Sequence, residues 1–359
     1  MRTESDPERR EAQKRVEAWW RRENSDRPAV LLTAPADGAL PYDGPAGENL
    51  HEYWTNPDIV IPRELYRLEN TFYAGEAFPV LFPVSGRIVS VLTRLLGAPN
   101  RYVNTETTWS EPIIHDWASR PSFVFDRKNR WWLICRDLLQ RGREALEEQA
   151  ERTGRRYYLG TPDLNGPTEI LAGLRGREAF AMDFYDNPEA IAPALQEINR
   201  AWYHAWQACT EITHSLGGYF FWMCIWSERP AVDLQSDVSG LISREMFREY
   251  LLPFVEEQTH LVERTIYHLD GPDAIRHLDS ILELSELDAV QWVPGAGAAP
   301  AAEWIPLLRR IQEAGKSVYT YCAPEEVPAI AEALPPEGLM LVAECESEAQ
   351  AREILRALS

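Results

Sequence analysis

A histidine and an aspartate two positions apart end an apolar run near residue 270. The stretch "TIYHLDGPDAIRHLD" covers residues 265 to 279, and its apolar run stops at Gly271-Pro272. Residues i and i+2 of a strand point to the same face, so His268 and Asp270 are predicted to project together at the carboxyl end of a strand. Proteins of the α/β class place their chemistry at such ends.

Both side chains are of types that bind metal ions. Zinc takes imidazole, thiolate and carboxylate ligands, and a catalytic zinc site uses three of them with a fourth position open. Cys345 lies at the end of the last apolar run and completes such a set with His268 and Asp270. The alternative is a hydrogen-bonded His268–Asp270 pair, with Cys345 as a small buried hydrophobic residue. Spacing alone leaves both interpretations open.

A repeated pattern of strands and helices would position these residues. Short apolar runs, each followed by a helical pattern, occupy residues 29–35, 78–85, 157–166, 219–227, 265–271, 289–295, 317–324 and 339–347. Runs without polar alternation fit parallel strands that are buried on both faces. The pattern predicts the α/β class and a single (β/α)8 TIM barrel over residues 1–359. Residues 1–27 are predicted to form an N-terminal helical extension, and residues 98–130 an insertion over the barrel mouth.

Active sites of such barrels lie at the carboxyl ends of the strands, so residues after the runs are candidates. Asp163, Asp237 and Asp270 are predicted to be catalytic carboxylates. Asp237 lies in "DLQSDVSGLIS" (233–243), which is predicted to be a loop after the fourth run. The predicted substrate-binding residues are Trp226, Arg229, Gln291, Trp292 and Cys322.

Composition excludes several classes of partner. The formal net charge is -20, and a surface of that sign repels nucleic acids and anionic membranes. No apolar run reaches the roughly 18 residues of a transmembrane helix, and the start of the chain lacks a signal-peptide pattern. The 5 cysteines are scattered, which favours reduced thiols. A cytoplasmic enzyme with a small-molecule substrate is therefore predicted.

Three stretches together resemble the uroporphyrinogen decarboxylase superfamily. They are "TPDLNGPTEILAGLRGREAFAMDFYDNPEAI", "SDVSGLISREMFREYLLPFVEEQ" and "YHLDGPDAIRHLDSILELSELDAVQWVPGAG", and the likeness runs over residues 155–347. The resemblance implies the barrel fold. The decarboxylase branch carries an arginine-rich stretch after the first strand, whereas "LLTAPADGALPYDG" (31–44) has no arginine. Decarboxylation of uroporphyrinogen is therefore disfavoured.

The other branch consists of zinc-dependent methyltransferases that move a methyl group between a corrinoid protein and a thiol. Their zinc ligands are a His-x-Cys at the end of the fifth strand and a cysteine after the eighth. His268 and Cys345 match two of these, and Asp270 stands in place of the first cysteine. The resemblance thus implies a zinc ion on His268, Asp270 and Cys345, and a corrinoid supplied by a partner protein. A carboxylate ligand would make the zinc a harder centre.

Two further function classes stay open. A metal-free lyase or sugar-processing barrel would use paired carboxylates drawn from Asp163, Glu228, Asp237 and Asp270. A non-catalytic binding subunit would keep the fold without the chemistry. The many polar residues at the predicted strand ends favour an enzyme.

Overall fold

A seven-stranded sheet lies at the centre of the computed structural model, which describes residues 7–84, 91–295 and 297–358. Its strand order is β2-β1-β13-β12-β11-β10-β9, and neighbours are parallel except for β2, which runs antiparallel to β1. The strands are β1 (Ala29–Pro35), β2 (Thr71–Gly75), β9 (Ala231–Gln235), β10 (Arg264–Asp270), β11 (Ala289–Val293), β12 (Ser317–Tyr321) and β13 (Leu339–Glu344). The predicted α/β class with a central parallel sheet is confirmed.

Two further strands, β3 (Val80–Leu81) and β6 (Tyr158–Leu159), form a separate parallel pair. In the described residues neither is hydrogen-bonded to the large sheet as a strand, so closure into one barrel stays a prediction. The arrangement is nevertheless barrel-like, because β3, β6 and six strands of the sheet all contribute side chains to one buried cluster. These include Ala29, Val80, Tyr158, Ala231, Ile266, Ala289, Tyr319 and Met340.

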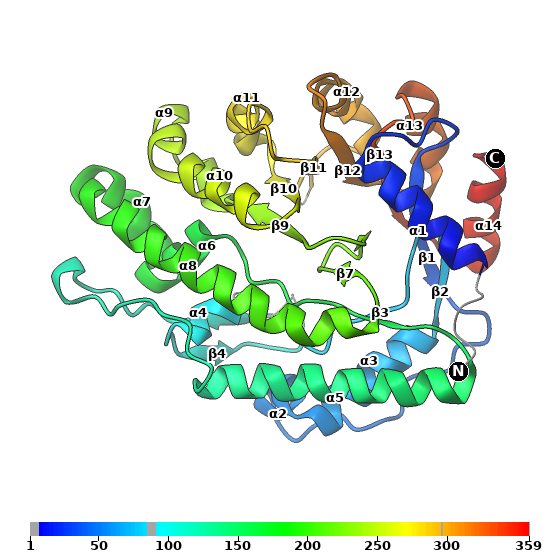
Figure 1. Ribbon diagram of the computed structural model, residues 1–359, viewed down its shortest axis with the longest axis horizontal. Helices are drawn as coiled ribbons and strands as arrows, with labels where there is room; N and C mark the ends of the chain where they lie inside the picture. The colour runs from blue at the N-terminus through cyan, green and yellow to red at the C-terminus, as the bar shows by residue number, and fades with distance from the viewer. Residues whose placement is uncertain (1–6, 85–90, 296, 359) are drawn as a thin grey trace.

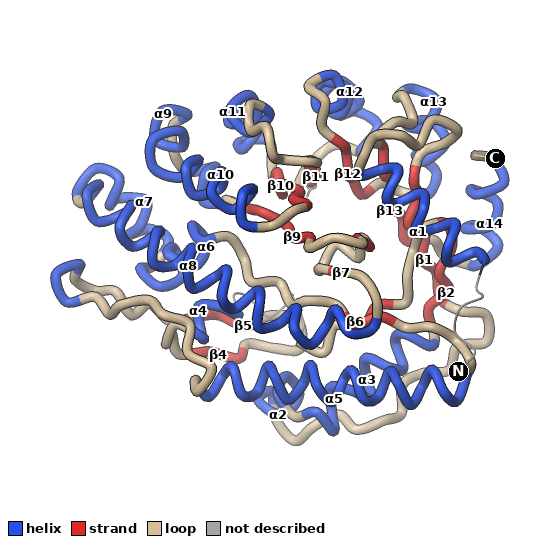
Figure 2. The backbone as a smooth tube through the Cα atoms, viewed as in Figure 1, coloured by secondary structure: helices blue, strands red, loops and turns tan. Residues whose placement is uncertain are grey.

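Helices surround the strands, as Figures 1 and 2 show. The α-helices are α1 (Pro7–Trp20), α2 (Leu50–Thr55), α3 (Pro57–Glu69), α4 (Val91–Leu95), α5 (Arg130–Thr153), α6 (Pro167–Arg175), α7 (Arg177–Asp186), α8 (Pro188–Thr213), α9 (Arg244–Met246), α10 (Leu252–Leu261), α11 (Leu278–Leu282), α12 (Ile305–Glu313), α13 (Val327–Ala333) and α14 (Glu348–Ala357). Short 3-10 turns and one π turn, η4 (Phe247–Leu251), join them. Over the described ranges, none of these helices is both long and apolar enough to span a bilayer.

The predicted fourth strand is wrong. Residues 219–227 form an antiparallel hairpin, β7 (Tyr219–Phe220) and β8 (Trp226–Ser227), outside the seven-stranded sheet. Its side chains belong to the same buried cluster as the inward faces of the strands, so the segment is apolar without being a sheet strand. The edge position of the sheet beside β10 is taken by β9, whose sequence "AVDLQ" was predicted to be partly loop.

Helix α1 covers the amino-terminal ends of the strands. The indole N–H of Trp19 donates to the carbonyl of Val318 at the start of β12, at 3.1 Å. The indole N–H of Trp20 donates to the carbonyl of Trp226 in the hairpin, also at 3.1 Å. The predicted N-terminal helix is therefore present, and it packs on the end of the sheet opposite the predicted site.

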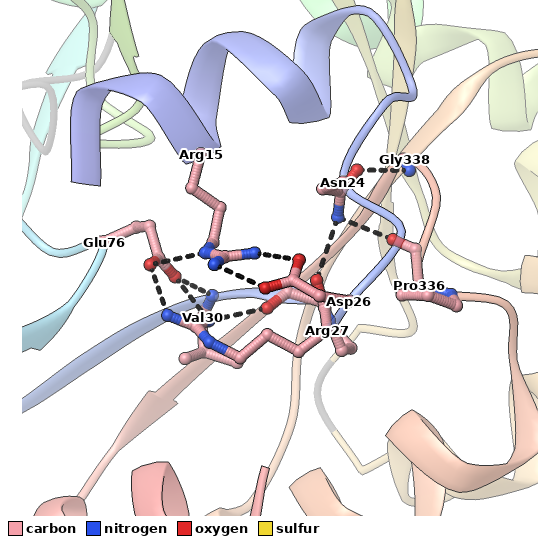
Figure 3. A network of polar contacts seen from close by, with 9 residues as sticks. Arg15, Asn24, Asp26, Arg27, Val30, Glu76, Pro336 and Gly338 are labelled. Atoms are coloured by element: carbon pink, nitrogen blue, oxygen red, sulfur yellow. Dashed lines mark hydrogen bonds and ion pairs between the residues drawn. The ribbon is translucent and has the colours of Figure 1, made fainter. Parts of the chain in front are cut away.

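A buried carboxylate ties this end together (Figure 3). Glu76, 3% exposed, accepts hydrogen bonds from the Val30 N–H at 2.7 Å and from both terminal nitrogens of Arg27 at 2.7 and 3.0 Å. Arg15 of α1 lies 3.4 Å from the same carboxylate and also forms a two-bond pair with Asp26. The network joins α1, β1 and the chain after β2.

The 98–130 segment has two parts. Its first part is the hairpin β4 (Asn100–Tyr102) and β5 (Thr108–Ser110), whose turn accepts a hydrogen bond at the Asn104 carbonyl from the indole of Trp54 at 3.2 Å. Its second part packs on α8, where Arg120 pairs with Glu197 at 2.9 Å. The turn of the hairpin therefore lies beside α2, which borders the candidate site described below.

Candidate functional site

Three possible metal ligands meet at the carboxyl ends of β9 and β10. Asp237, His268 and Asp270 each offer one ligand atom, and these atoms all lie within 4.8 Å of one another. His268 and Asp270 share the inward face of β10, as their spacing predicted. Strand β10 ends there because Gly271 has φ +80 and Pro272 lacks an N–H for a sheet hydrogen bond. Asp237 starts the 3-10 turn η3 (Asp237–Leu241), just after β9.

The ring of His268 is held by Gln291. Its Nδ1 lies 2.5 Å from the Gln291 Oε1, and the two residues are register partners across β10 and β11. With the carboxamide oriented in this way, its oxygen can only accept, so Nδ1 carries the hydrogen. The Nε2 atom then carries a lone pair, and it lies 3.9 Å from the Oδ1 of Asp237. This is the arrangement of a histidine metal ligand with its second nitrogen anchored.

More carboxyl groups surround this cluster. Burial raises the pKa of Asp163 well above its usual range, and the charge of Asp233 raises it further. Burial, with a smaller effect of Asp237, raises the pKa of Glu169 to about 8. The pKa values of Asp233 and Asp237 are also raised by burial, although His268 opposes the shift in both. So many acids in one place need protons or a cation to balance their charge.

A tight turn brings Asp163 and Glu169 to the cluster. The Asn165 N–H donates to Asp163 at 2.7 Å, and Glu169 accepts from the Val238 N–H at 3.0 Å. Gly166 makes the approach possible, because a Cβ atom there would lie 1.9 Å from the carbonyl oxygen of Gln235. The close contact with the end of β9 thus explains why a glycine stands at position 166, between β6 and α6.

A cavity of about 670 Å³ opens over the cluster. Its walls come from the carboxyl ends of β9 and β10, from α2 and α3, and from the turn between β4 and β5. Several polar atoms of its lining residues are buried without a hydrogen-bond partner in the described structure. They are Asn165 Oδ1, Gln235 Nε2 and Asp237 Oδ1. Buried polar groups are normally paired, so these atoms fit a site that a ligand completes.

Five of the predicted site residues lie together and the others do not. Asp163, Asp237, His268, Asp270 and Gln291 form or adjoin the cluster. Cys345 lies outside the group of ligand atoms found in the described residues, so its place in the ligand set stays a prediction. Cys345 instead lines a neighbouring cavity.

The remaining predicted residues point elsewhere for identifiable reasons. Trp292 follows the inward-facing Gln291 and so faces outward, where its ring packs 4.9 Å from Trp304. Cys322 also contacts the outer core, with its Sγ 3.8 Å from the Val342 carbonyl. Trp226 and Arg229 belong to the opposite end of the sheet. Arg229 pairs there with Glu263, just before β10 begins.

Sequence reasoning missed Glu169 and Gln235 as parts of the site. Asp233 and Gln235 alternate with apolar residues in β9, and with Asp237 they continue a two-residue period. That period could have identified β9 as a strand with polar residues on its inward face. No feature of the sequence marked Glu169 as a site residue, because an acidic residue in the first turn of a helix is common.

Comparison with known proteins supports the fold. No protein-family model matches the chain, and no curated protein sequence matches it. Among solved structures, a methyltransferase from Methanosarcina mazei aligns over 97% of this chain and 98% of its own, with a TM-score of 0.59 and 17% sequence identity. The likeness is one of fold. The predicted similarity to a methyltransferase is confirmed at that level, and the superfamily itself stays a prediction.

Replacing Glu169 by glutamine is expected to remove part of the pH dependence of stability. The pKa of Glu169 is near 8 when folded and near 4.5 when unfolded, so folding favours its protonated form. That contribution is complete below pH 4.5 and is lost as the pH rises through about 8. In metal-free protein at pH 9, Glu169→Gln should therefore be more stable than wild type, by about 2 kcal/mol.

Thermal unfolding at pH 5 and pH 9 in the presence of a chelator measures this difference. Glu151→Gln is the matched control, because Glu151 is exposed on α5. A Glu169→Gln variant that loses as much stability as wild type between the two pH values would contradict the prediction.

Proposed function

We propose that the chain is a metal-dependent methyltransferase whose reaction takes place at Asp237, His268 and Asp270. The observation that carries the proposal is the convergence of these three ligand atoms within 4.8 Å, with His268 oriented by Gln291. The fold shared with a methyltransferase supports the type of reaction. The cavity of about 670 Å³ is large enough for a small-molecule substrate.

The donor set fits a divalent cation. One imidazole and two carboxylates are ligands that zinc accepts, and three protein ligands leave a position for the substrate. The raised pKa values of the surrounding acids give the same indication, since a cation would offset their mutual repulsion. A bound zinc ion would keep a coordinated thiol deprotonated near neutral pH.

The protein's own residues have three tasks in this proposal. Gln291 fixes the ring of His268 so that Nε2 faces the cluster. Asp163, which lines the cavity, accepts the proton that leaves the acceptor thiol once a bound cation has lowered its raised pKa. Gln235 binds the substrate through its unpaired side-chain N–H group.

The methyl donor is proposed to be a corrinoid carried by a partner protein, as the sequence resemblance implies. The partner would approach the mouth of the cavity at the carboxyl ends of the strands. The turn between β4 and β5, with Thr105 and Glu106, lines this mouth. We propose that this part of the 98–130 insertion covers the bound substrate.

Metal content and methyl transfer together test the proposal. Purified wild type, supplied with zinc under reducing conditions, is expected to hold about one zinc ion per chain. It should then transfer the methyl group of methylcobalamin to a small thiol such as 2-mercaptoethanol. His268→Ala should lose the metal and lower the transfer rate at least about 100-fold. His260→Ala, at an exposed position of α10, should behave like wild type. Wild type without bound metal would refute the proposal.

A second candidate is a metal-free acid–base enzyme. It is favoured by the unequal environments of Asp163, Glu169 and Asp237, since pairs of acids with separated pKa values are typical of such catalysis. Turnover that survives a chelator and falls with Glu169→Gln would identify this mechanism. Turnover that stops when the metal is removed would exclude it.

A further inference from the structure

A second cavity adjoins the first. Its volume is about 790 Å³, and it lies among β1, β2, α3 and the carboxyl ends of β12 and β13. The two cavities share Arg67, Trp222, Cys224 and Tyr321 as lining residues. Ligands in the two cavities would therefore be separated by only a few side chains. The metal proposal uses only the first cavity.

Aromatic rings dominate the second cavity. Six of its lining residues are aromatic: Tyr66, Tyr73, Phe78, Trp222, Tyr319 and Tyr321. Two of the hydroxyl groups are already used, since Tyr319 donates to the Met223 carbonyl at 3.0 Å and Tyr66 to the Leu40 carbonyl. Burial raises the pKa of Tyr73 and of Tyr321 to about 12, so both phenols are neutral. The walls thus offer neutral rings more than free hydrogen-bond donors.

The charge at this cavity is negative. Glu344 and Glu346 line it and are exposed, and neither has an ion-pair partner in the described part of the chain. Arg67 is the basic residue among the described lining residues, and its Nε donates to Glu64 at 3.0 Å. Two unpaired carboxylates therefore face one arginine that is already paired. The formal net charge of -20 adds a field that attracts cations to the molecule.

We propose that the second cavity binds a methylated onium cation, meaning a quaternary ammonium or tertiary sulfonium group. Such cations have no N–H or S–H to donate, so they bind through contact with ring faces and the charge of nearby carboxylates, without hydrogen bonds. An anion would be repelled by Glu344 and Glu346.

Binding of the cation does not depend on the proposed function. Its role as a source of methyl groups does rest on the proposed function. Transfer from an onium group breaks one C–N or C–S bond and leaves its electron pair on the nitrogen or sulfur. The methyl group forms one new bond to the reduced corrinoid that remains after transfer to the thiol, and this regenerates the methylcorrinoid donor of the proposed function. No oxidant or reductant is needed.

Calorimetric titration of metal-free protein with choline tests the site. The comparison ligand is 3,3-dimethylbutan-1-ol, which has the shape of choline without the charge. Choline is expected to bind, and the alcohol at least about ten-fold more weakly. Equal affinities, or no binding of choline, would overturn the proposal.

Two substitutions locate the bound choline. Tyr73→Leu, which removes a ring specific to the second cavity, should weaken choline binding about ten-fold, while Tyr73→Phe keeps the ring and the affinity. If Tyr73→Leu does not fold, Tyr66→Leu replaces it, since Tyr66 is half-buried and lines the second cavity but not the first. Choline binding that is unchanged by loss of the ring would refute this location.

The metal variant separates this proposal from the proposed function. His268→Ala should leave choline binding unchanged, because His268 does not line the second cavity. Loss of choline binding in His268→Ala would overturn the second-cavity site. Choline binding by a wild type that takes up no metal would support the onium site and refute only the metal-dependent reaction.

Discussion

Asp237→Asn is expected to weaken zinc binding at least about 100-fold, whereas Cys345→Ser leaves zinc affinity unchanged. Asp237 contributes one of three ligand atoms that lie within 4.8 Å of one another, and Cys345 contributes none. Asparagine keeps the size of the side chain but removes the negative charge that a divalent cation requires. Loss of an outer-shell partner alone costs 10- to 100-fold in metal affinity, and loss of a direct ligand should cost more.

Competition with a chromophoric chelator measures these affinities. Asp186→Asn, an exposed aspartate at the end of α7, is the matched control for the loss of one charge. The opposite result, with metal retained in Asp237→Asn and lost in Cys345→Ser, would restore the set His268, Asp270 and Cys345. It would also require the chain after β13 to move toward β10.

The contrast between Asp237 and Cys345 shows what spacing can predict. His268 and Asp270 could be paired from the sequence because a strand has a fixed two-residue period. The strand was recognisable because its apolar run ends at Gly271-Pro272, which cannot extend it. Cys345 lies beyond the end of β13, where no periodicity determines its direction. A ligand set that spans two strand ends therefore could not be derived from spacing.

The sequence predicted a sheet strand at residues 219–227, where the structure has a hairpin, and a partial loop where it has β9. The reason is related. A run as apolar as "YFFWMCIWS" is typical of a strand buried on both faces. The same composition suits a segment enclosed by other strands, and the structure places it there. Strand β9 was not predicted because its inward residues, Asp233 and Gln235, are polar. The polar residues that line the candidate site therefore removed the apolar pattern by which the strand could have been recognised.

Several other elements could be predicted because their signals are local. Strands β11, β12 and β13 lie within the predicted runs, and β10 begins one residue before its run. Ser243 is of a type favoured at helix N-caps, and its Oγ accepts from the Met246 N–H at 3.2 Å. Pro253 cannot donate a helix hydrogen bond, and the π turn η4 ends just before the helix that contains it. Contacts between distant segments, such as Glu169 with Val238, had no comparable local signal.

Glu76→Gln is expected to lower the free energy of unfolding by about 3 kcal/mol. Glu76 is buried between Arg27 and Arg15, and its oxygens accept from three N–H groups around them. A glutamine would place an amide N–H where one acceptor is needed, so a donor would face other donors. The side chains of Arg15 and Arg27, 22% and 18% exposed, would remain at the site without their buried counter-charge.

Urea denaturation of wild type and variant gives this difference, and Glu211→Gln provides the comparison. Glu211 pairs with Arg127 at 2.6 Å, but both side chains are more than half exposed, so its loss should cost no more than about 1 kcal/mol. Equal effects of the two substitutions would contradict a structural role for Glu76. A larger loss at Glu76 is expected because α1, β1 and the chain after β2 meet there (Figure 3). The substitution should therefore destabilise the amino-terminal end of the sheet, whereas Asp237, His268 and Asp270 lie at the other end.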